Sequence, residues 1–144
     1  MSEQKTVRDI MTRNIISIEQ NKNALEAARL MTERNVSSLI VHGDDETAIG
    51  ILTERDFLSK VCSKDLQASK VNIADIMSRI QMSAQPDTPI EVAVQRMINN
   101  KIRRLPVMES GKVVGIITVT DMTKVLRNTL LMDGVLSALS DGSD

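Results

Sequence analysis

The 144-residue sequence is almost without aromatic side chains, since it has one Phe and neither Tyr nor Trp. Proteins that hold single-stranded nucleic acid stack the bases on aromatic rings, so the composition argues against that class. Lys plus Arg (18) and Asp plus Glu (19) nearly balance, which leaves no net positive charge to attract DNA or an anionic membrane. Any flat ring that binds this protein must therefore lie between aliphatic side chains.

Cysteine, histidine and long apolar runs are also scarce. The single Cys62 cannot form a disulfide within the chain, and the single His42 gives no cluster from which to build a zinc site. The apolar runs are short, and the N-terminal residues lack the pattern of a targeting peptide. No Ser-His-Asp or Cys-His set and no phosphate-binding glycine loop is apparent. We therefore predict a cytoplasmic protein that is not an enzyme, with no metal site and no membrane or nucleic-acid partner.

The strongest positive signal is an internal repeat. Residues 7–12 (Val-Arg-Asp-Ile-Met-Thr) return as residues 73–78 (Ile-Ala-Asp-Ile-Met-Ser). Apolar residues with the spacing of one helix face follow in both copies: Ala24, Ala27, Ala28 and Met31, then Ile90, Ala93, Val94 and Met97. Two short strands around a glycine turn and a second helix come next in each copy. Each copy is thus predicted to be an α+β unit of βαββα type.

Neither copy is expected to be stable alone, because a unit of about 60 residues buries too little surface. We therefore expect the copies to pack sheet to sheet with pseudo-twofold symmetry. The predicted boundaries are 1–66 for the first repeat, 67–129 for the second, and 130–144 for a C-terminal amphipathic helix with a polar tail. The apolar stripe of that helix is expected to pack on the same chain, to join a homodimer or to dock a client protein: Met132, Val135, Leu136 and Leu139.

Three motifs recur in order. Asp-Ile-Met opens each copy, Arg-Arg-Leu-Pro-Val forms a strand at residues 103–107, and Gly-Ile-Ile-Thr-x-x-Asp enters the last helix at residues 115–121, with a close copy at 50–56. This set resembles the CBS-domain pair, also called the Bateman module, over residues 7 to 127. The resemblance implies tandem CBS domains that bind adenosine derivatives such as AMP, ADP, ATP, NAD or S-adenosylmethionine in clefts between the repeats. It also implies dimers and a regulatory role.

Thr118 and Asp121 stand three apart across the last strand-to-helix turn, as Thr53 and Asp56 do in the first copy. Two interpretations remain open for each pair. Thr and Asp can cap the helix without any ligand, or the carboxylate can accept hydrogen bonds from both hydroxyls of a ribose. The family resemblance favours ribose recognition.

Cations distinguish the two predicted clefts. The second copy has Arg103 and Arg104 where the first has Ser37 and Ser38. Arginine binds phosphate in a bidentate manner, although exposed Arg pairs also occur at strand ends without a ligand. We therefore expect phosphorylated ligands to prefer the cleft of Asp121. The complete set of predicted ligand-binding residues is Thr118, Thr120, Asp121, Arg103, Arg104, Pro106, Met82, Ser83, Arg55, Thr53, Asp56, Ser17 and Ser38.

The predicted function is a regulatory sensor in which an adenine nucleotide of the AMP, ADP or ATP class binds between the repeats and changes the geometry of a homodimer. No cofactor is predicted besides this ligand, and whether Mg²⁺ accompanies ATP stays open. The alternative is a structural dimerisation or protein-interaction module for an unidentified client protein, without a physiological nucleotide.

Overall fold

The computed structural model describes residues 5–129, so the stripe at residues 132–139 lies outside the described part. In chain order the elements are α1 (Val7–Ile10), β1 (Ser17–Glu19), α2 (Ala24–Arg34), β2 (Ser38–His42), β3 (Ala48–Thr53), α3 (Glu54–Phe57), the π-helical turn η1 (Leu58–Cys62), the 3-10 turn η2 (Ala68–Lys70), α4 (Ile73–Ile76), β4 (Ser78–Arg79), α5 (Ile90–Asn100), β5 (Arg104–Glu109), β6 (Lys112–Thr118) and α6 (Val119–Thr129). None of the helices within these residues is both long and apolar enough to span a bilayer.

The two long equivalent helices end in the same way but begin differently, since α5 follows Pro89 without a side-chain cap. Asn23 caps α2, because its side chain accepts a hydrogen bond from the Glu26 amide at 2.9 Å. Asn35 ends α2 in the left-handed region, and Lys101 does the same for α5. Of the two faces expected from the helical spacing, five residues are buried and three are partly buried. The buried ones are Ala24, Ala27 and Met31 in α2 with Ala93 and Met97 in α5, and the partly buried ones are Ala28, Ile90 and Val94.

Each half of the molecule contains the same sheet of four segments. In the first half, β1 runs parallel to β2, and β2, β3 and β4 pair antiparallel. In the second half, the β5–β6 hairpin is flanked by single bridges, parallel from Ala84 to Val107 and antiparallel from Thr12 to Ile116. The α+β prediction is confirmed, but the first strand expected in the second copy is reduced to one bridge.

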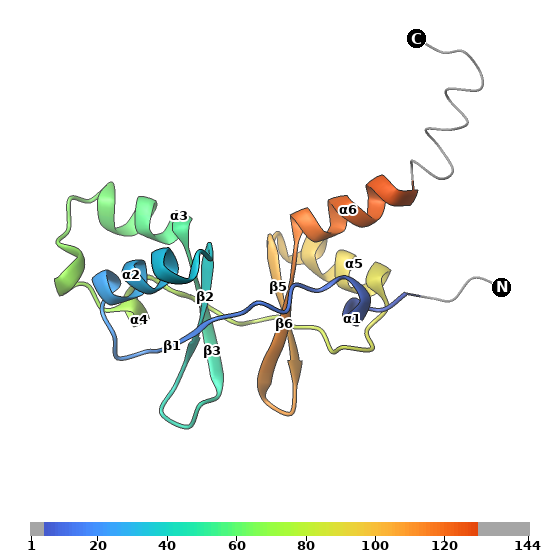
Figure 1. Ribbon diagram of the computed structural model, residues 1–144, viewed down its shortest axis with the longest axis horizontal. Coiled ribbons are helices and arrows are strands. Elements are labelled where there is room, and N and C mark those ends of the chain that lie inside the picture. Colours follow the sequence, from blue (N-terminus) through green and yellow to red (C-terminus); the bar gives the residue numbers. More distant parts are fainter. Residues whose placement is uncertain (1–4, 130–144) are drawn as a thin grey trace, which may run out of the picture.

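The first short helix of each copy packs on the opposite half of the molecule (Figure 1). Val7 and Met11, at α1, belong to the same buried apolar cluster as Leu105 of β5. Ile73 and Ile76 of α4 instead belong to the cluster under β2 and β3. The first half in space is therefore one continuous stretch of chain up to β4. The second half combines the segment at α1 with the chain that follows β4.

Two glycines allow these crossing segments to approach the central strands. A Cβ on Gly115 would lie 2.6 Å from the Met11 sulfur, and one on Gly50 would lie 2.6 Å from the Met77 sulfur. Carbonyl oxygens of the same segments would lie 3.1 Å and 3.0 Å away, so little room exists for relaxation. The Met of the Asp-Ile-Met motif thus packs against the Gly of the Gly-Ile-Ile-Thr or Gly-Ile-Leu-Thr motif of the other copy.

The two sheets face each other at the centre of the molecule, and the helices lie on the outside (Figure 1). Ile40 of β2, Ile51 of β3 and Ile116 of β6 form the buried contact between them. This arrangement confirms the predicted sheet-to-sheet packing with pseudo-twofold symmetry. The contact is the smallest of the three apolar clusters found among residues 5–129, and the two larger clusters lie between each sheet and its own helices.

Candidate functional site

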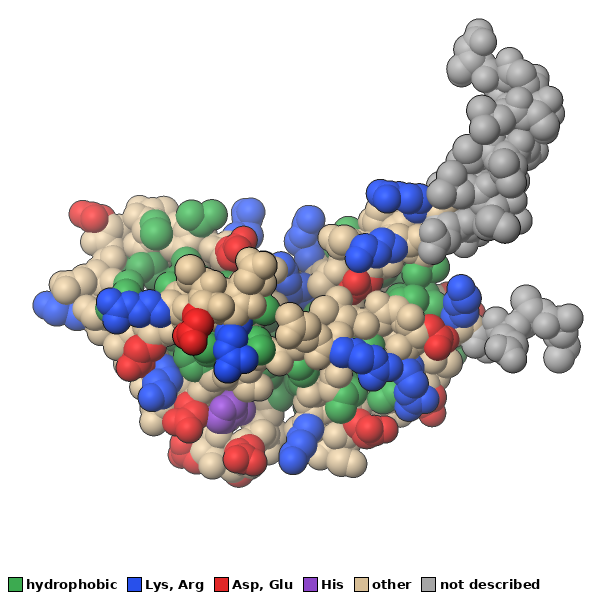
Figure 2. Space-filling view, viewed as in Figure 1, with side chains coloured by type: hydrophobic (Ala, Val, Ile, Leu, Met, Phe, Trp, Pro, Cys, Tyr) green, Lys and Arg blue, Asp and Glu red, His purple; other side chains and the backbone are tan. Residues whose placement is uncertain are grey.

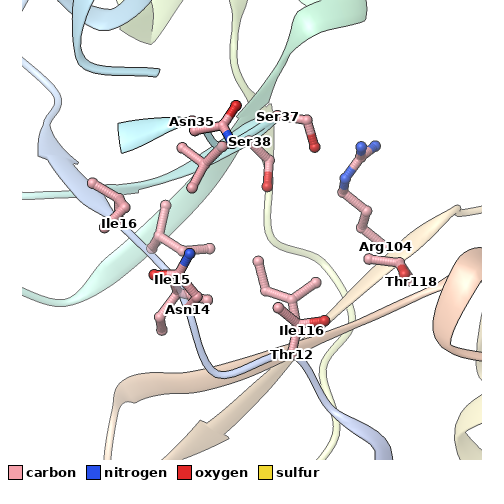
Figure 3. A pocket seen from close by; sticks show the side chains of 12 residues that line it. Thr12, Asn14, Ile15, Ile16, Asn35, Ser37, Ser38, Arg104, Ile116 and Thr118 are labelled. Atoms are coloured by element: carbon pink, nitrogen blue, oxygen red, sulfur yellow. The ribbon is translucent and has the colours of Figure 1, made fainter. Parts of the chain in front are cut away.

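A cavity of about 250 Å³ lies between the two halves, beside the start of α6 (Figure 3). One wall comes from the first repeat and the opposite wall from β5 and β6. Its lining residues are Thr12, Asn14, Ile15, Ile16, Asn35, Val36, Ser37, Ser38, Ile40, Arg104, Ile116 and Thr118. The cavity exists only because both repeats contribute to it.

Aliphatic side chains line much of the cavity. Ile15, Ile16, Val36, Ile40 and Ile116 all reach it, and Ile40 and Ile116 also belong to the contact between the two sheets. Because the chain has almost no aromatic side chains, a flat ring must lie against aliphatic ones. These five side chains provide such a surface. The amides of the lining asparagines can both donate and accept hydrogen bonds, as the edge of a base requires.

Asp121 lies behind Thr118 at the polar end of the cavity and is 7 % exposed. Its Oδ2 accepts hydrogen bonds from the Thr118 amide at 2.9 Å and from the Thr118 hydroxyl at 3.1 Å. The Asp121 amide in turn donates to the Thr118 hydroxyl at 3.2 Å, so the pair caps α6 reciprocally. The Thr12 hydroxyl lies 3.2 Å from both carboxylate oxygens. The capping interpretation is thus correct as geometry, and it holds the carboxylate in one orientation.

Asp56 has the same cap but a different outer partner. Its Oδ2 accepts from the Thr53 amide at 2.8 Å and from the Thr53 hydroxyl at 3.1 Å. Its Oδ1 forms an ion pair with Lys60 Nζ at 3.0 Å, whereas Oδ1 of Asp121 has the neutral hydroxyl of Thr12. The two carboxylates are therefore equivalent in position but not in charge environment.

Positive charge gathers where the two halves meet. Arg104 extends from β5 toward Ser37 of the opposite repeat (Figure 3). Figure 2 shows Lys and Arg side chains on both sides of the notch between the halves, at the end where α3 and α6 begin. The amino-terminal end of α6 adds its partial positive charge there. This end of the cavity can accommodate an anion. No group of three or more His, Cys, Asp or Glu side chains within residues 5–129 is arranged to hold a metal ion.

The cavity brings together four of the residues that the sequence singled out. Thr118, Arg104 and Ser38 line it, and Asp121 lies directly behind Thr118. Thr120 lies exposed in the first turn of α6. Arg103 is exposed before β5, where its carbonyl accepts a hydrogen bond from the Val119 amide at 3.2 Å.

The remaining predicted residues lie outside this cavity. Pro106 is buried in β5, Met82 packs against the second apolar cluster, and the Ser83 carbonyl accepts a hydrogen bond from Arg96. Ser17 lines a separate cavity beside His42 and Lys112. The other three surround the first turn of α3: Thr53, Asp56 and exposed Arg55.

Several lining residues were not predicted as site residues. The polar ones are Thr12, Asn14, Asn35 and Ser37, and the apolar ones include Val36, Ile40 and Ile116. Thr12 is the last residue of the repeated segment 7–12, so the repeat was a signal that could have identified it. The sequence did not reveal that this segment lies beside the second copy's Asp121, because the crossing of α1 is a long-range feature.

Comparison with known proteins gives a consistent result. Residues 7–63 and 73–128 each match the CBS domain family. The uncharacterized protein MK0525 of Methanopyrus kandleri is 33 % identical over 121 residues, which cover 83 % of this chain and 62 % of that protein. A conserved protein of known structure from Pyrococcus horikoshii is similar with a TM-score of 0.77 at 29 % identity, covering 88 % of this chain and 96 % of that one.

A third similar protein has been solved with ligands. The CBS domain pair of protein MJ0100, in complex with 5-methylthioadenosine and S-adenosyl-L-methionine, gives a TM-score of 0.76 at 26 % identity, covering 88 % of this chain and 99 % of that one. The chain spans about three fifths of the length of MK0525 and less than half of other relatives that it matches. The two family matches together cover most of the sequence and coincide with the two copies of the internal repeat. The chain therefore belongs to the CBS domain family and carries two CBS domains in tandem.

Proposed function

We propose that this chain is a regulatory, non-catalytic module that binds an adenine nucleotide of the AMP, ADP or ATP class in the cavity beside Asp121. One observation carries the proposal. A single cavity between the repeats combines aliphatic walls and an arginine, and the buried, oriented carboxylate of Asp121 lies directly behind two of its lining residues, Thr118 and Thr12. The walls, the carboxylate and the arginine complement the base, the ribose hydroxyls and the phosphates of a nucleotide, respectively.

The hydrogen bonding of Asp121 supports ribose binding. Oδ2 is held by Thr118, so Oδ1 has a fixed direction and the Thr12 hydroxyl as its neighbour at 3.2 Å. A hydrogen bond of that length between a hydroxyl and a carboxylate is long, and a ribose hydroxyl can replace it with a shorter one. Capping and ribose binding are therefore compatible, because the cap orients the group that would accept the ligand.

The ligands of a similar protein and the size of the cavity both favour an adenine mononucleotide. Both compounds in the MJ0100 complex are derivatives of adenosine, which supports the same class of ligand for this chain. The cavity of about 250 Å³ is slightly smaller than typical ligand pockets, which hold roughly 300–1,000 Å³. A compact mononucleotide fits this volume better than a dinucleotide such as NAD.

We infer further that the module acts as a homodimer through its helical faces. An apolar groove of about 460 Å³ between α5 and α6 includes Val94, Val119 and Met122. An equivalent groove between α2 and α3 includes Met31, Phe57 and the exposed Leu58. Two similar apolar grooves related by an internal pseudo-twofold are suited to a symmetric contact with a second copy. The same grooves favour the alternative function, a protein-interaction module that needs no nucleotide.

Isothermal titration with AMP, ADP, ATP, NAD and S-adenosylmethionine tests the proposal. We expect wild-type protein to bind an adenine mononucleotide and Asp121→Ala to weaken binding about tenfold to a hundredfold, the cost of a hydrogen bond to a charged group. Asp56→Ala is the matched control and should bind as wild type does. Light scattering of the same samples reports the oligomeric state with and without ligand. If no compound binds at about 1 mM, the interaction-module alternative replaces the nucleotide proposal.

A further inference from the structure

Lys60 contacts the carboxylate oxygen of Asp56 that corresponds to an oxygen of Asp121 bonded by Thr12. Its Nζ lies 3.0 Å from Asp56 Oδ1 and donates a hydrogen bond to the carbonyl of Ile76, at the end of α4, at 2.8 Å. The ammonium therefore connects the carboxylate that caps α3 to the crossing helix α4. The Lys60 side chain is 37 % exposed and that of Asp56 is 10 % exposed, so the contact lies at the edge of the first half.

A local irregularity of the helix accompanies this contact. After four residues of α3 the chain enters the π-helical turn η1, in which the Ser63 amide donates to the Leu58 carbonyl at 2.9 Å. Lys60 lies within this wider turn. Single π-helical turns inside helices are rare and often occur at functional sites. The helix of the second repeat, α6, is a regular α-helix over Val119–Thr129 and has Val125 at the position that aligns with Lys60.

The outer partners of the two carboxylates differ in how readily a ligand can replace them. At Asp121 a ribose hydroxyl exchanges with the neutral hydroxyl of Thr12, at 3.2 Å. At Asp56 it must displace an ammonium ion at 3.0 Å and leave the Ile76 carbonyl without that donor. Both bonds have an ionised acceptor, but only the bond from Lys60 also has an ionised donor, so the second exchange gives up an attraction between two charges that the first does not.

We propose that Lys60 is an internal competitor for the ribose at Asp56, and that the chain for this reason binds one nucleotide, beside Asp121, although it carries two copies of the Thr-x-x-Asp motif. This inference rests on the proposed function. Lys60 acts here as a residue that determines which of two equivalent carboxylates accepts ligand. Its removal leaves Oδ1 of Asp56 without an ionised partner, and Oδ1 of Asp121 already has a neutral hydroxyl as its partner.

The test uses the full chain in an Asp121→Ala background, titrated with AMP, ADP and ATP by calorimetry. Lys60→Met removes the charge and keeps the length of the aliphatic stem. Lys60→Gln removes the charge but keeps a donor for the Ile76 carbonyl, so it serves where the Met variant disturbs α4. Lys60→Arg keeps the cation. Lys64→Met is the matched control, because it makes the same chemical change at an exposed lysine in the same connecting region. Circular dichroism establishes that each variant is folded.

Wild type should bind one nucleotide per chain, and Asp121→Ala should bind it about tenfold to a hundredfold more weakly. Adding Lys60→Met or Lys60→Gln should raise the nucleotide affinity at least about tenfold above that of Asp121→Ala alone. This corresponds to roughly 1.4 kcal/mol of binding free energy. Adding Lys60→Arg or Lys64→Met should restore nothing. If wild type already binds two nucleotides, or if the folded Lys60→Met and Lys60→Gln variants stay as weak as Asp121→Ala, the Lys60 inference is wrong while the proposed function stands. A wild type that binds no nucleotide overturns the proposed function itself.

Discussion

At the scale of single residues, the described structure distinguishes two side chains that the sequence presents as equals. Asp56 and Asp121 follow the same Thr-x-x-Asp spacing and are both 7 % exposed. The difference comes from residues outside the motif, Lys60 on one side and Thr12 on the other. A motif of this kind therefore specifies the helix cap, whereas residues outside the motif determine the other partner of each carboxylate.

Thr12→Val tests the contribution of the bond to Asp121. The change keeps the shape of the side chain but removes the hydroxyl that lies 3.2 Å from both carboxylate oxygens. We expect the free energy of unfolding to fall by about 0.5–1.5 kcal/mol, the usual value of one such bond. Urea denaturation measures it. Thr120→Val, at an exposed position of α6, is the control and should change stability by less than about 0.5 kcal/mol. Equal effects at both positions would contradict the importance of the Thr12 contact.

At the scale of elements, the packing of the crossing segments depends on glycine. The Met11 sulfur would lie 2.6 Å and the Thr12 carbonyl oxygen 3.1 Å from a side chain at position 115. The Thr12 backbone cannot retreat without losing its antiparallel bridge to Ile116. Close approach of backbone to backbone is thus required at this strand, and only glycine provides it.

Gly115→Ala should accordingly destabilise the protein by about 1–3 kcal/mol, the usual cost of overpacking a core. Thermal and urea denaturation measure the effect. Gly43→Ala is the control, because a Cβ there would have its nearest neighbour at 3.6 Å, an ordinary contact. That change should lie within about 0.5 kcal/mol of wild type. An unchanged stability for Gly115→Ala would show that α1 can move away from β6 at no cost.

The elements also show what could be predicted from sequence and what could not. The spacing of Ala24, Ala27 and Met31 correctly predicted the buried face of α2, and the repeat predicted α5 and both hairpins. Helical periodicity reports only the face that a segment buries. It carries no information on which sheet covers that face, so the exchange of α1 and α4 between the halves was not predicted. For the same reason Thr118 and Arg104 were identified as candidate site residues, but Thr12 and Asn35 were missed.

At the scale of the whole molecule, the spatial halves do not coincide with the copies of the repeat. The first half is built from one continuous stretch, because Ile73 and Ile76 complete the cluster that includes Ile18 and Leu52. The second half requires Val7 and Met11 from the other end of the described chain. A cut between the copies would therefore leave both pieces without a part of their cores.

Two fragments of similar length test this organisation. Residues 1–66 contain a whole copy of the repeat but lack the buried Ile73 and Ile76, whereas residues 13–80 contain the whole first cluster. We expect fragment 13–80 to show more helix by circular dichroism and a more cooperative thermal transition than fragment 1–66, since each is near the size at which a core becomes marginal. A fragment 1–66 that unfolds as cooperatively as fragment 13–80 would show that α4 adds little to the first half.

The crossing of α1 and α4 also has a consequence for how such a chain can arise. A chain with one copy of the repeat would reproduce these contacts only in a dimer. In that dimer the first segment of each subunit would pack on the other subunit. The tandem protein is thus equivalent to a domain-swapped dimer whose two subunits have been joined end to end. Joining them makes the exchange intramolecular, so the fold no longer depends on protein concentration.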